Sequence, residues 1–269
     1  TTGMQRTFHD YWQTATGLAG ALWHELLDRN DNSNSTMIAM YCPNHVDYCP
    51  IVLAIALLCG AKITPINPLF TEAELERLLT ASQTSILLVH HSKVDVVSQL
   101  LAQQKCPSVK HVIVIPDDDT SDHSIPEGMI NLNSLRNYDN PLYHTQSSTD
   151  SEDQRIKKAS DEDPFCVPNS SGTTTGLPKG VILTPQNIIA NLWQVHHVEY
   201  PAFASHHTLL TPPPFFHIFA FTAAMLFPAR GGTKTITKSG RFVFGLFFHL
   251  VPDYQPHRAL LVPPIVVQL

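Results

Sequence analysis

The chain has 269 residues, a formal net charge of −6 at pH 7, and 43% hydrophobic residues against 15% charged residues. That apolar fraction is ample for one large or two modest buried cores. The mildly acidic balance provides no basic surface for nucleic acid or for an anionic membrane, so neither partner is predicted. The longest apolar run, residues 51–59, is too short to cross a bilayer, and no transmembrane segment is predicted.

The cysteines and histidines indicate neither a disulfide framework nor a metal centre. The five cysteines include no Cys-x-x-Cys pair, which predicts buried free thiols in a reducing compartment. They stand at Cys42, Cys49, Cys59, Cys106 and Cys166. The histidine pairs at 90/91, 196/197 and 206/207 lack helical i, i+4 spacing with a third ligand. No structural or transition metal is therefore predicted.

Alternating patterns predict helices and strands that follow one another along residues 1–116. Apolar residues at steps of three and four predict helices, and Thr71 with Glu74 forms a capping box for one of them. Helices are expected at 8–26, 46–60, 71–81 and 92–104. Short apolar runs predict strands at 36–41, 62–66, 85–89 and 111–115. This alternation is typical of an α/β fold in which parallel-rich sheets are covered by helices.

Residues 117–163 have a different character. Acidic, serine-rich patches at 117–122 and 147–153 are typical of a long solvated connection that is partly disordered. We expect this connection to separate a first α/β half, residues 1–116, from a second half, residues 164–269. In the second half, Thr184 followed by Pro185 predicts the N-cap and first turn of another helix.

The most informative segment is residues 170–180, which hold five hydroxyl side chains, three glycines and one lysine. Apolar runs flank it, so the expected arrangement is strand, loop, strand. Glycines let the backbone approach a ligand closely, and exposed N–H groups and hydroxyls can surround phosphate oxygens. The segment is therefore predicted to be a loop that binds nucleotide phosphates, and the alternative is a flexible linker. It is not the common P-loop, because Lys179 is followed by Gly180 rather than by Ser or Thr.

This segment resembles the signature loop of the adenylate-forming enzymes, which include acyl-CoA synthetases, 4-coumarate–CoA ligases, beetle luciferases and peptide-synthetase adenylation domains. The usual pattern is Ser-Ser-Gly-Thr-Thr-Gly-x-Pro-Lys-Gly-Val, and this chain has one threonine more. Asn169 replaces the family's aromatic residue, and Pro185 replaces a histidine. Further blocks that resemble the 4-coumarate–CoA ligase and luciferase branch are Pro43-Asn44, 65–75, 214–219, Arg241-Phe242 and 262–266.

The resemblance implies ATP, Mg²⁺ and coenzyme A as cofactors and a small carboxylic acid as substrate. It assigns the ATP phosphates to Ser170, Ser171, Gly172, Thr173, Thr174, Thr175, Gly176 and Lys179. Lys179 and His217 are the implied catalytic residues: the lysine faces the leaving pyrophosphate, and the histidine lies near the acid carboxylate. The implied acyl pocket comprises His217, Phe219, Phe221 and Ala223, and Arg241 is implied at the coenzyme A entrance.

Simpler interpretations of these residues stay open at this point. His217 could be a histidine packed between Phe216 and Phe219, and the aromatic residues that follow it could belong to the core. Arg241 could be a surface arginine without a ligand. Val243 also stands where the family commonly carries an acidic residue.

The family's later motifs do not occur in residues 1–269. These are a Tyr-Gly-x-Thr-Glu block, an aspartate that holds the ribose, and a C-terminal domain with a catalytic lysine. We therefore expect an incomplete AMP-binding N-terminal domain, from a carboxylic acid–CoA ligase of the 4-coumarate–CoA ligase type, that has little or no activity alone. The alternatives are a luciferase-like monooxygenase, a truncated non-catalytic nucleotide-binding protein and a plain structural α/β domain. The expected location is cytoplasmic or peroxisomal, and the acid and the oligomeric state stay open.

Overall fold

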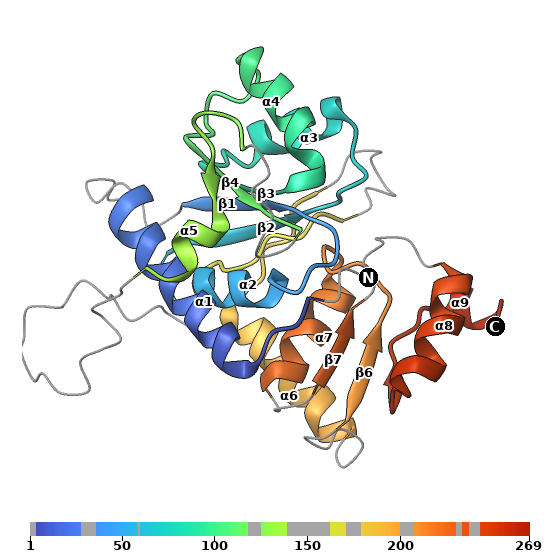
Figure 1. Cartoon of the computed structure of the whole chain (residues 1–269). Coiled ribbons are helices and arrows are strands. Elements are labelled where there is room, and N and C mark those ends of the chain that lie inside the picture. Colours follow the sequence, from blue (N-terminus) through green and yellow to red (C-terminus); the bar gives the residue numbers. More distant parts are fainter. Residues whose placement is uncertain are drawn as a thin grey trace, which may run out of the picture.

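A computed structural model describes residues 4–27, 36–58, 60–117, 125–138, 162–170, 179–199, 207–229, 233–236 and 243–269 (Figure 1). Within these ranges the strands form two sheets, and every pair of neighbouring strands is parallel. The predicted α/β class with parallel-rich sheets is confirmed.

The first sheet has the strand order β2-β1-β3-β4-β5. Its strands are β1 (Met37–Tyr41), β2 (Lys62–Ile66), β3 (Ile86–His90), β4 (His111–Ile115) and the short β5 (Ile130–Asn131). Apolar side chains of β1 alternate between two cores: Ile38 and Met40 pack on one face, and Ala39 and Tyr41 on the other. Because both faces are covered, most residues of β1 to β4 are apolar, as expected for a buried parallel sheet.

Helices cover both faces of this sheet (Figure 1). On one face lie α1 (Phe8–Ala21), a π-helical turn (Leu22–Leu26), α2 (Tyr48–Ala56) and α5 (Leu132–Arg136). On the other lie α3 (Glu72–Ala81) and α4 (Val94–Ala102), with the 3₁₀ turn His91–Lys93 before α4. The predicted capping box of α3 is present, since Glu74 N–H donates to Thr71 Oγ1 at 3.4 Å and Thr71 N–H donates to Glu74 Oε2 at 2.8 Å.

The second sheet has the order β7-β6-β8, with β6 (Thr208–Thr211), β7 (Thr233–Ile236) and β8 (Arg258–Ala259). Its helices are α6 (Pro185–Glu199), α7 (Ile218–Ala229), α8 (Phe244–Tyr254) and α9 (Pro263–Val266). The predicted cap of α6 is confirmed, because Asn187 N–H donates to Thr184 Oγ1 at 3.2 Å. Side chains of α7 join the same core as α1 and α2, so the two sheets share one apolar layer.

The two sheets are wound in the same way. The chain enters each sheet at an inner strand, crosses to a strand on one side, and then returns to a strand on the other side. β1, β2 and β3 follow this course in the first sheet, and β6, β7 and β8 in the second. Each sheet therefore has a point where the strand order reverses, next to β1 and next to β6. In open α/β sheets, ligands bind outside the carboxyl ends of the strands at such points.

Three expectations need correction. The stretch 117–163 is not only a surface connection, because its described part holds β5 and α5, and Leu132 is fully buried. The first helix changes to a π-helical turn at Leu22, and the second is shorter than expected, from Tyr48 to Ala56.

The four described cysteines are buried and free, as predicted, and Cys59 lies outside the described residues. In the part of the chain that the structure describes, no helix has both the length and the apolarity needed to span a membrane.

Candidate functional site

The residues on either side of the glycine-rich segment, 166–169 and 180–183, pair to form a stem at the edge of the first sheet. Cys166 pairs with Ile63 of β2 in parallel and with Leu183 in antiparallel fashion, and Asn169 pairs with Gly180. At the top of the stem, Ser170 N–H donates to the Lys179 carbonyl at 2.8 Å, and Lys179 N–H donates to Ser170 Oγ at 3.3 Å. The loop base is thus a hairpin, as the flanking apolar runs predict.

Side chains fix the stem to β2. Thr64 Oγ1 donates to the Val167 carbonyl at 2.9 Å, and Asn169 Nδ2 donates to Thr64 Oγ1 at 3.3 Å. Asn169, which departs from the family's aromatic residue, is therefore part of this anchor. A Cβ at Gly180 would lie 2.9 Å from Val167 Cγ1, so the two sides of the stem approach closely at that glycine.

The stem leaves two predicted phosphate ligands exposed at the loop base, Ser170 and Lys179. The other six, Ser171, Gly172, Thr173, Thr174, Thr175 and Gly176, lie outside the described residues. Arg241, expected near coenzyme A, lies outside them as well. The roles of these seven residues stay predictions.

A pocket of about 310 Å³ opens at the carboxyl ends of β6 and β8, where the strand order of the second sheet reverses. Its volume is in the range of small-molecule sites. The lining residues are Pro213, Pro214, His217, Phe219, Leu261, Val262 and Pro263. His217 is the one titratable side chain among them, and the others are apolar. The pocket therefore suits the apolar body of a ligand whose polar end meets the imidazole.

His217 stands at the start of α7. Its N–H donates to the Pro214 carbonyl at 3.0 Å, and its own carbonyl accepts the Phe221 N–H at 2.9 Å, so it caps the helix with its backbone. Its side chain is exposed and lines the pocket. Its ring also lies 6.3 Å from that of Phe216, so the alternative of a histidine packed beside Phe216 agrees with the structure in part.

The three residues predicted to line the pocket beside His217 separate into different environments. Phe219 lines the pocket and is 45% exposed, whereas Phe221 is fully buried and meets the Tyr48 ring edge-on at 6.4 Å. Two residues along a helix differ by about 200° in direction, so Phe219 and Phe221 face opposite ways. Ala223 is half-buried and is not part of the pocket lining. The prediction that Phe221 contacts substrate is corrected: it is a core residue.

One buried residue has contacts that the sequence alone did not indicate. Asn44, in the loop after β1, is 3% exposed and reaches the loop after β6. Its Oδ1 accepts the Phe215 N–H at 2.7 Å, and its Nδ2 donates to the Pro213 carbonyl at 2.9 Å. In the sequence, Asn44 is visible only as part of the Pro-Asn block.

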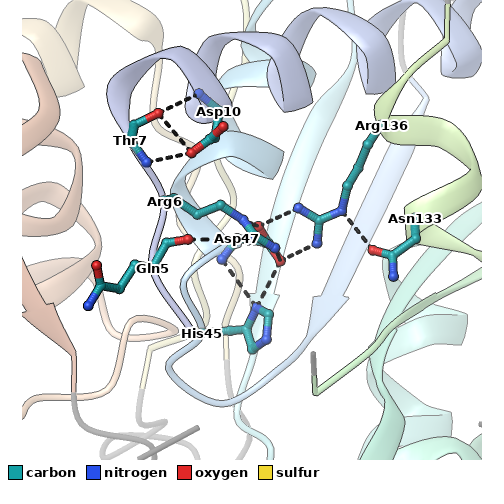
Figure 2. Close-up of polar contacts among 8 residues, drawn as sticks. All are labelled: Gln5, Arg6, Thr7, Asp10, His45, Asp47, Asn133 and Arg136. Carbon is teal, nitrogen blue, oxygen red and sulfur yellow. Dashed lines mark hydrogen bonds and ion pairs between the residues drawn. The ribbon is translucent and has the colours of Figure 1, made fainter. Parts of the chain in front are cut away.

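Charged groups fill the corresponding corner of the first sheet, as Figure 2 shows. Asp47, fully buried at the start of α2, is held by Arg6 Nε at 2.9 Å and by Arg136 Nη1 at 2.9 Å. Burial raises the pKa of Asp47, but hydrogen bonds and charge from Arg136 outweigh it, and the pKa lies below its usual value. Burial lowers the pKa of His45, whose Nδ1 accepts the Asp47 N–H at 3.1 Å.

Histidines continue this cluster toward β3 and β4. The rings of His45 and His90 meet edge-on at 5.6 Å, and His90 Nε2 lies 3.2 Å from Asp117 Oδ1. His91 Nδ1 lies 3.7 Å from the other oxygen of Asp117. Among the described residues, no group of three or more His, Cys, Asp or Glu side chains is arranged to hold a metal ion. This corner is a network of ion pairs and hydrogen bonds.

The described residues thus combine two parallel sheets of the same winding, a paired stem beside β2 and a pocket beyond β6. Solved structures show the same fold. A long-chain-fatty-acid–CoA ligase of Archaeoglobus fulgidus has a TM-score of 0.72 at 22% identity, over 96% of this chain and 45% of that chain. A red-emitting luciferase of Phrixothrix hirtus has a TM-score of 0.74 at 24% identity, over 96% of this chain and 46% of that chain.

The chain belongs to the AMP-binding enzyme family, whose family model matches residues 1–269. Among curated relatives, 4-coumarate–CoA ligase 1 of Arabidopsis thaliana is 31% identical over 272 residues, covering 100% of this chain and 44% of the relative. The 4-coumarate–CoA ligase 4 of the same plant is 28% identical, over 86% of this chain and 38% of the relative. The chain thus spans less than half the length of these relatives.

Proposed function

We propose that the protein carrying this chain is a carboxylic acid–CoA ligase of the 4-coumarate–CoA ligase type. In the first step, a carboxylate oxygen attacks the α-phosphorus of ATP, the bond to the β-phosphate breaks, and pyrophosphate leaves. In the second step, the thiol of coenzyme A attacks the acyl carbonyl carbon, loses its proton, and displaces AMP. Two of the relatives named above carry the name 4-coumarate–CoA ligase, which supports this assignment.

The observation that carries the proposal is the pocket between the carboxyl ends of β6 and β8. It lies at the reversal point of its sheet, where ligands of α/β folds bind. Its apolar lining matches an acid with an aryl or alkyl body, because an uncharged body gains by leaving water for such a surface. A second carboxylate at the far end of the acid would be buried without a partner in this lining, at a large cost.

His217 would act at the mouth of this pocket. An imidazole can donate a hydrogen bond to a carboxylate or to the phosphate oxygens next to it. Backbone hydrogen bonds at the start of α7 fix the residue that carries this imidazole at the mouth of the pocket. Its role in the reaction is to hold the carboxylate in line with the α-phosphate.

The hairpin supplies the groups for ATP. Lys179 and Ser170 would meet the β- and γ-phosphates together with residues 171–176, and Lys179 would offset the charge of the departing pyrophosphate. Mg²⁺, arriving with ATP, would offset further charge on the phosphates. Arg241 is proposed at the coenzyme A entrance.

The test is thioester formation by the intact protein that carries this sequence. The protein is incubated with ATP, Mg²⁺, coenzyme A and one acid from a panel of 4-coumarate, medium-chain and long-chain fatty acids, and malonate. Mass spectrometry then detects the acyl-CoA. We expect product with an apolar acid and none with malonate, and a large loss in Lys179→Ala. Oxygen-dependent light without thioester would replace the proposal by a luciferase-like monooxygenase. Nucleotide binding without either product would indicate a non-catalytic protein.

A further inference from the structure

We propose that Asn44 is a positioning residue for the acid pocket, a role that rests on the function proposed above. Asn44 follows β1 of the first sheet, whereas the pocket lies beyond β6 and β8 of the second. Its side chain is a polar link between the loop after β1 and the loop after β6. These loops occupy equivalent places, each at the reversal point of its own sheet.

The amide of Asn44 uses both of its ends on one short segment. Oδ1 accepts from Phe215 N–H at 2.7 Å, and Nδ2 donates to the Pro213 carbonyl at 2.9 Å, with a longer contact to the Thr211 carbonyl at 3.5 Å. Pro213 lines the pocket directly, and Phe215 lies two residues before His217. The two bonds therefore fix the backbone on which the wall of the pocket and the imidazole depend.

Prolines make this link more important. Residues 212–214 are all proline, so they have no N–H groups with which the segment could bond to neighbouring backbone. Phe215 N–H is the first donor after them, and its ring is fully buried against Tyr48 at 5.4 Å. Without Asn44, a buried N–H and a buried carbonyl would lose their protein partner, and the segment would move to find others.

The experiment compares Asn44→Ala with Asn131→Ala in the intact protein. Asn131 is the control, because its Oδ1 also accepts a backbone N–H, that of Asn133 at 2.9 Å, but beside α5, which lies apart from β6 and α7 in Figure 1. We expect Asn44→Ala to raise the KM for the acid by at least roughly tenfold, because both buried hydrogen bonds of the amide are lost and each is worth up to about tenfold. The KM of Asn44→Ala for ATP should stay within about twofold of the value for the unmutated protein. In Asn131→Ala, the KM values for the acid and for ATP should both stay within the same range.

A second readout needs no activity. Amide hydrogen exchange over residues 208–217 should become faster in Asn44→Ala and stay unchanged in Asn131→Ala. If Asn44→Ala does not fold, Asn44→Leu replaces it, since a branched side chain of similar shape fills the space and removes only the two hydrogen bonds. It should show the same selective rise of the acid KM.

The outcomes separate the two proposals. Equal rises of both KM values, or exchange that does not change at 208–217, would overturn the positioning role. A protein that forms no thioester with any acid would overturn the proposed function. The exchange measurement would then show only whether Asn44 holds the segment.

Discussion

The two sheets share one winding but use their reversal points differently. Beyond β1, ion pairs and histidines fill the corner, with Asp47 fully buried between Arg6 and Arg136. Beyond β6, prolines and other apolar side chains surround a pocket of about 310 Å³. In the first corner, charged groups pair with one another, whereas the second corner leaves apolar surface for a ligand. Strand topology therefore provides two positions where a ligand site could form, one next to β1 and one next to β6. The side chains at each position determine whether space for a ligand is left there.

The largest loss of stability is expected at the charged corner beyond β1, around Asp47, which we call the filled corner; the corner beyond β6 that holds the pocket is the open corner. Asp47→Ala leaves the largely buried guanidinium groups of Arg6 and Arg136 without their carboxylate, and it should lower the free energy of unfolding by about 3–5 kcal/mol. Urea denaturation measures the loss. Asp253→Ala, at an exposed position of α8, should change the stability by less than about 0.5 kcal/mol. Similar small losses in both variants would mean that the Asp47 network does not hold the first corner together.

The open corner offers a paired test on one helix. Phe221→Ala removes a fully buried ring and should cost about 3–5 kcal/mol of stability, measured by the same denaturation. Phe219→Ala removes a ring that is 45% exposed, and it should cost about 1 kcal/mol or less while weakening acid binding. Equal losses of stability in the two variants would contradict the assignment of Phe219 to the pocket and Phe221 to the core.

The filled corner should also respond to pH. Burial lowers the pKa of His45 below its ordinary 6.5, so the unfolded chain binds this proton more readily than the folded chain. The contribution of His45 to stability is therefore fully present above pH 6.5 and is lost as the pH falls below it. His45→Gln should flatten the decline below pH 6.5 by up to about 1.4 kcal/mol per pH unit.

Unfolding experiments across that range measure this slope. His9→Gln, at an exposed position, is the matched control and should change the slope less. An unchanged slope in His45→Gln would mean that the imidazole is not kept neutral by its burial.

The smallest losses of stability are expected at the helix N-caps, which both halves of the chain form with a threonine. Thr7 caps α1, with Asp10 N–H donating to Thr7 Oγ1 at 3.2 Å, and Thr184 caps α6 with the same distance from Asn187 N–H. Thr7→Ala and Thr184→Ala should each cost about 1 kcal/mol in urea denaturation. A large difference between them would show that the two halves are less equivalent than their winding suggests.

Local sequence signals predicted much of the fold. The strand of residues 111–115, the capping box at Thr71 and the cap at Thr184 follow from periodicity and side-chain chemistry that act within a few residues. The sequence could not reveal β5 and α5, because their stretch is surrounded by acidic, serine-rich residues, and their stability comes from contact with α1 and β4.

In the candidate site too, some features follow from local sequence patterns and others depend on the folded structure. The paired loop stem and the placement of His217 follow from motifs, whereas the opposite directions of Phe219 and Phe221 require a helix register that the resemblance did not consider. The role of Asn44 depends on a contact across 169 residues of sequence, to Pro213, and no local pattern indicates such a contact.

The most direct measurement is acid-dependent exchange between ATP and pyrophosphate by the intact protein and by two variants. Phe219→Asp places a charge in the open corner, and His45→Gln alters the filled one. The account predicts exchange with an apolar acid, its loss in Phe219→Asp, and its retention in His45→Gln at neutral pH. Exchange that survives in Phe219→Asp but disappears in a folded His45→Gln variant would contradict the placement of the acid beyond β6.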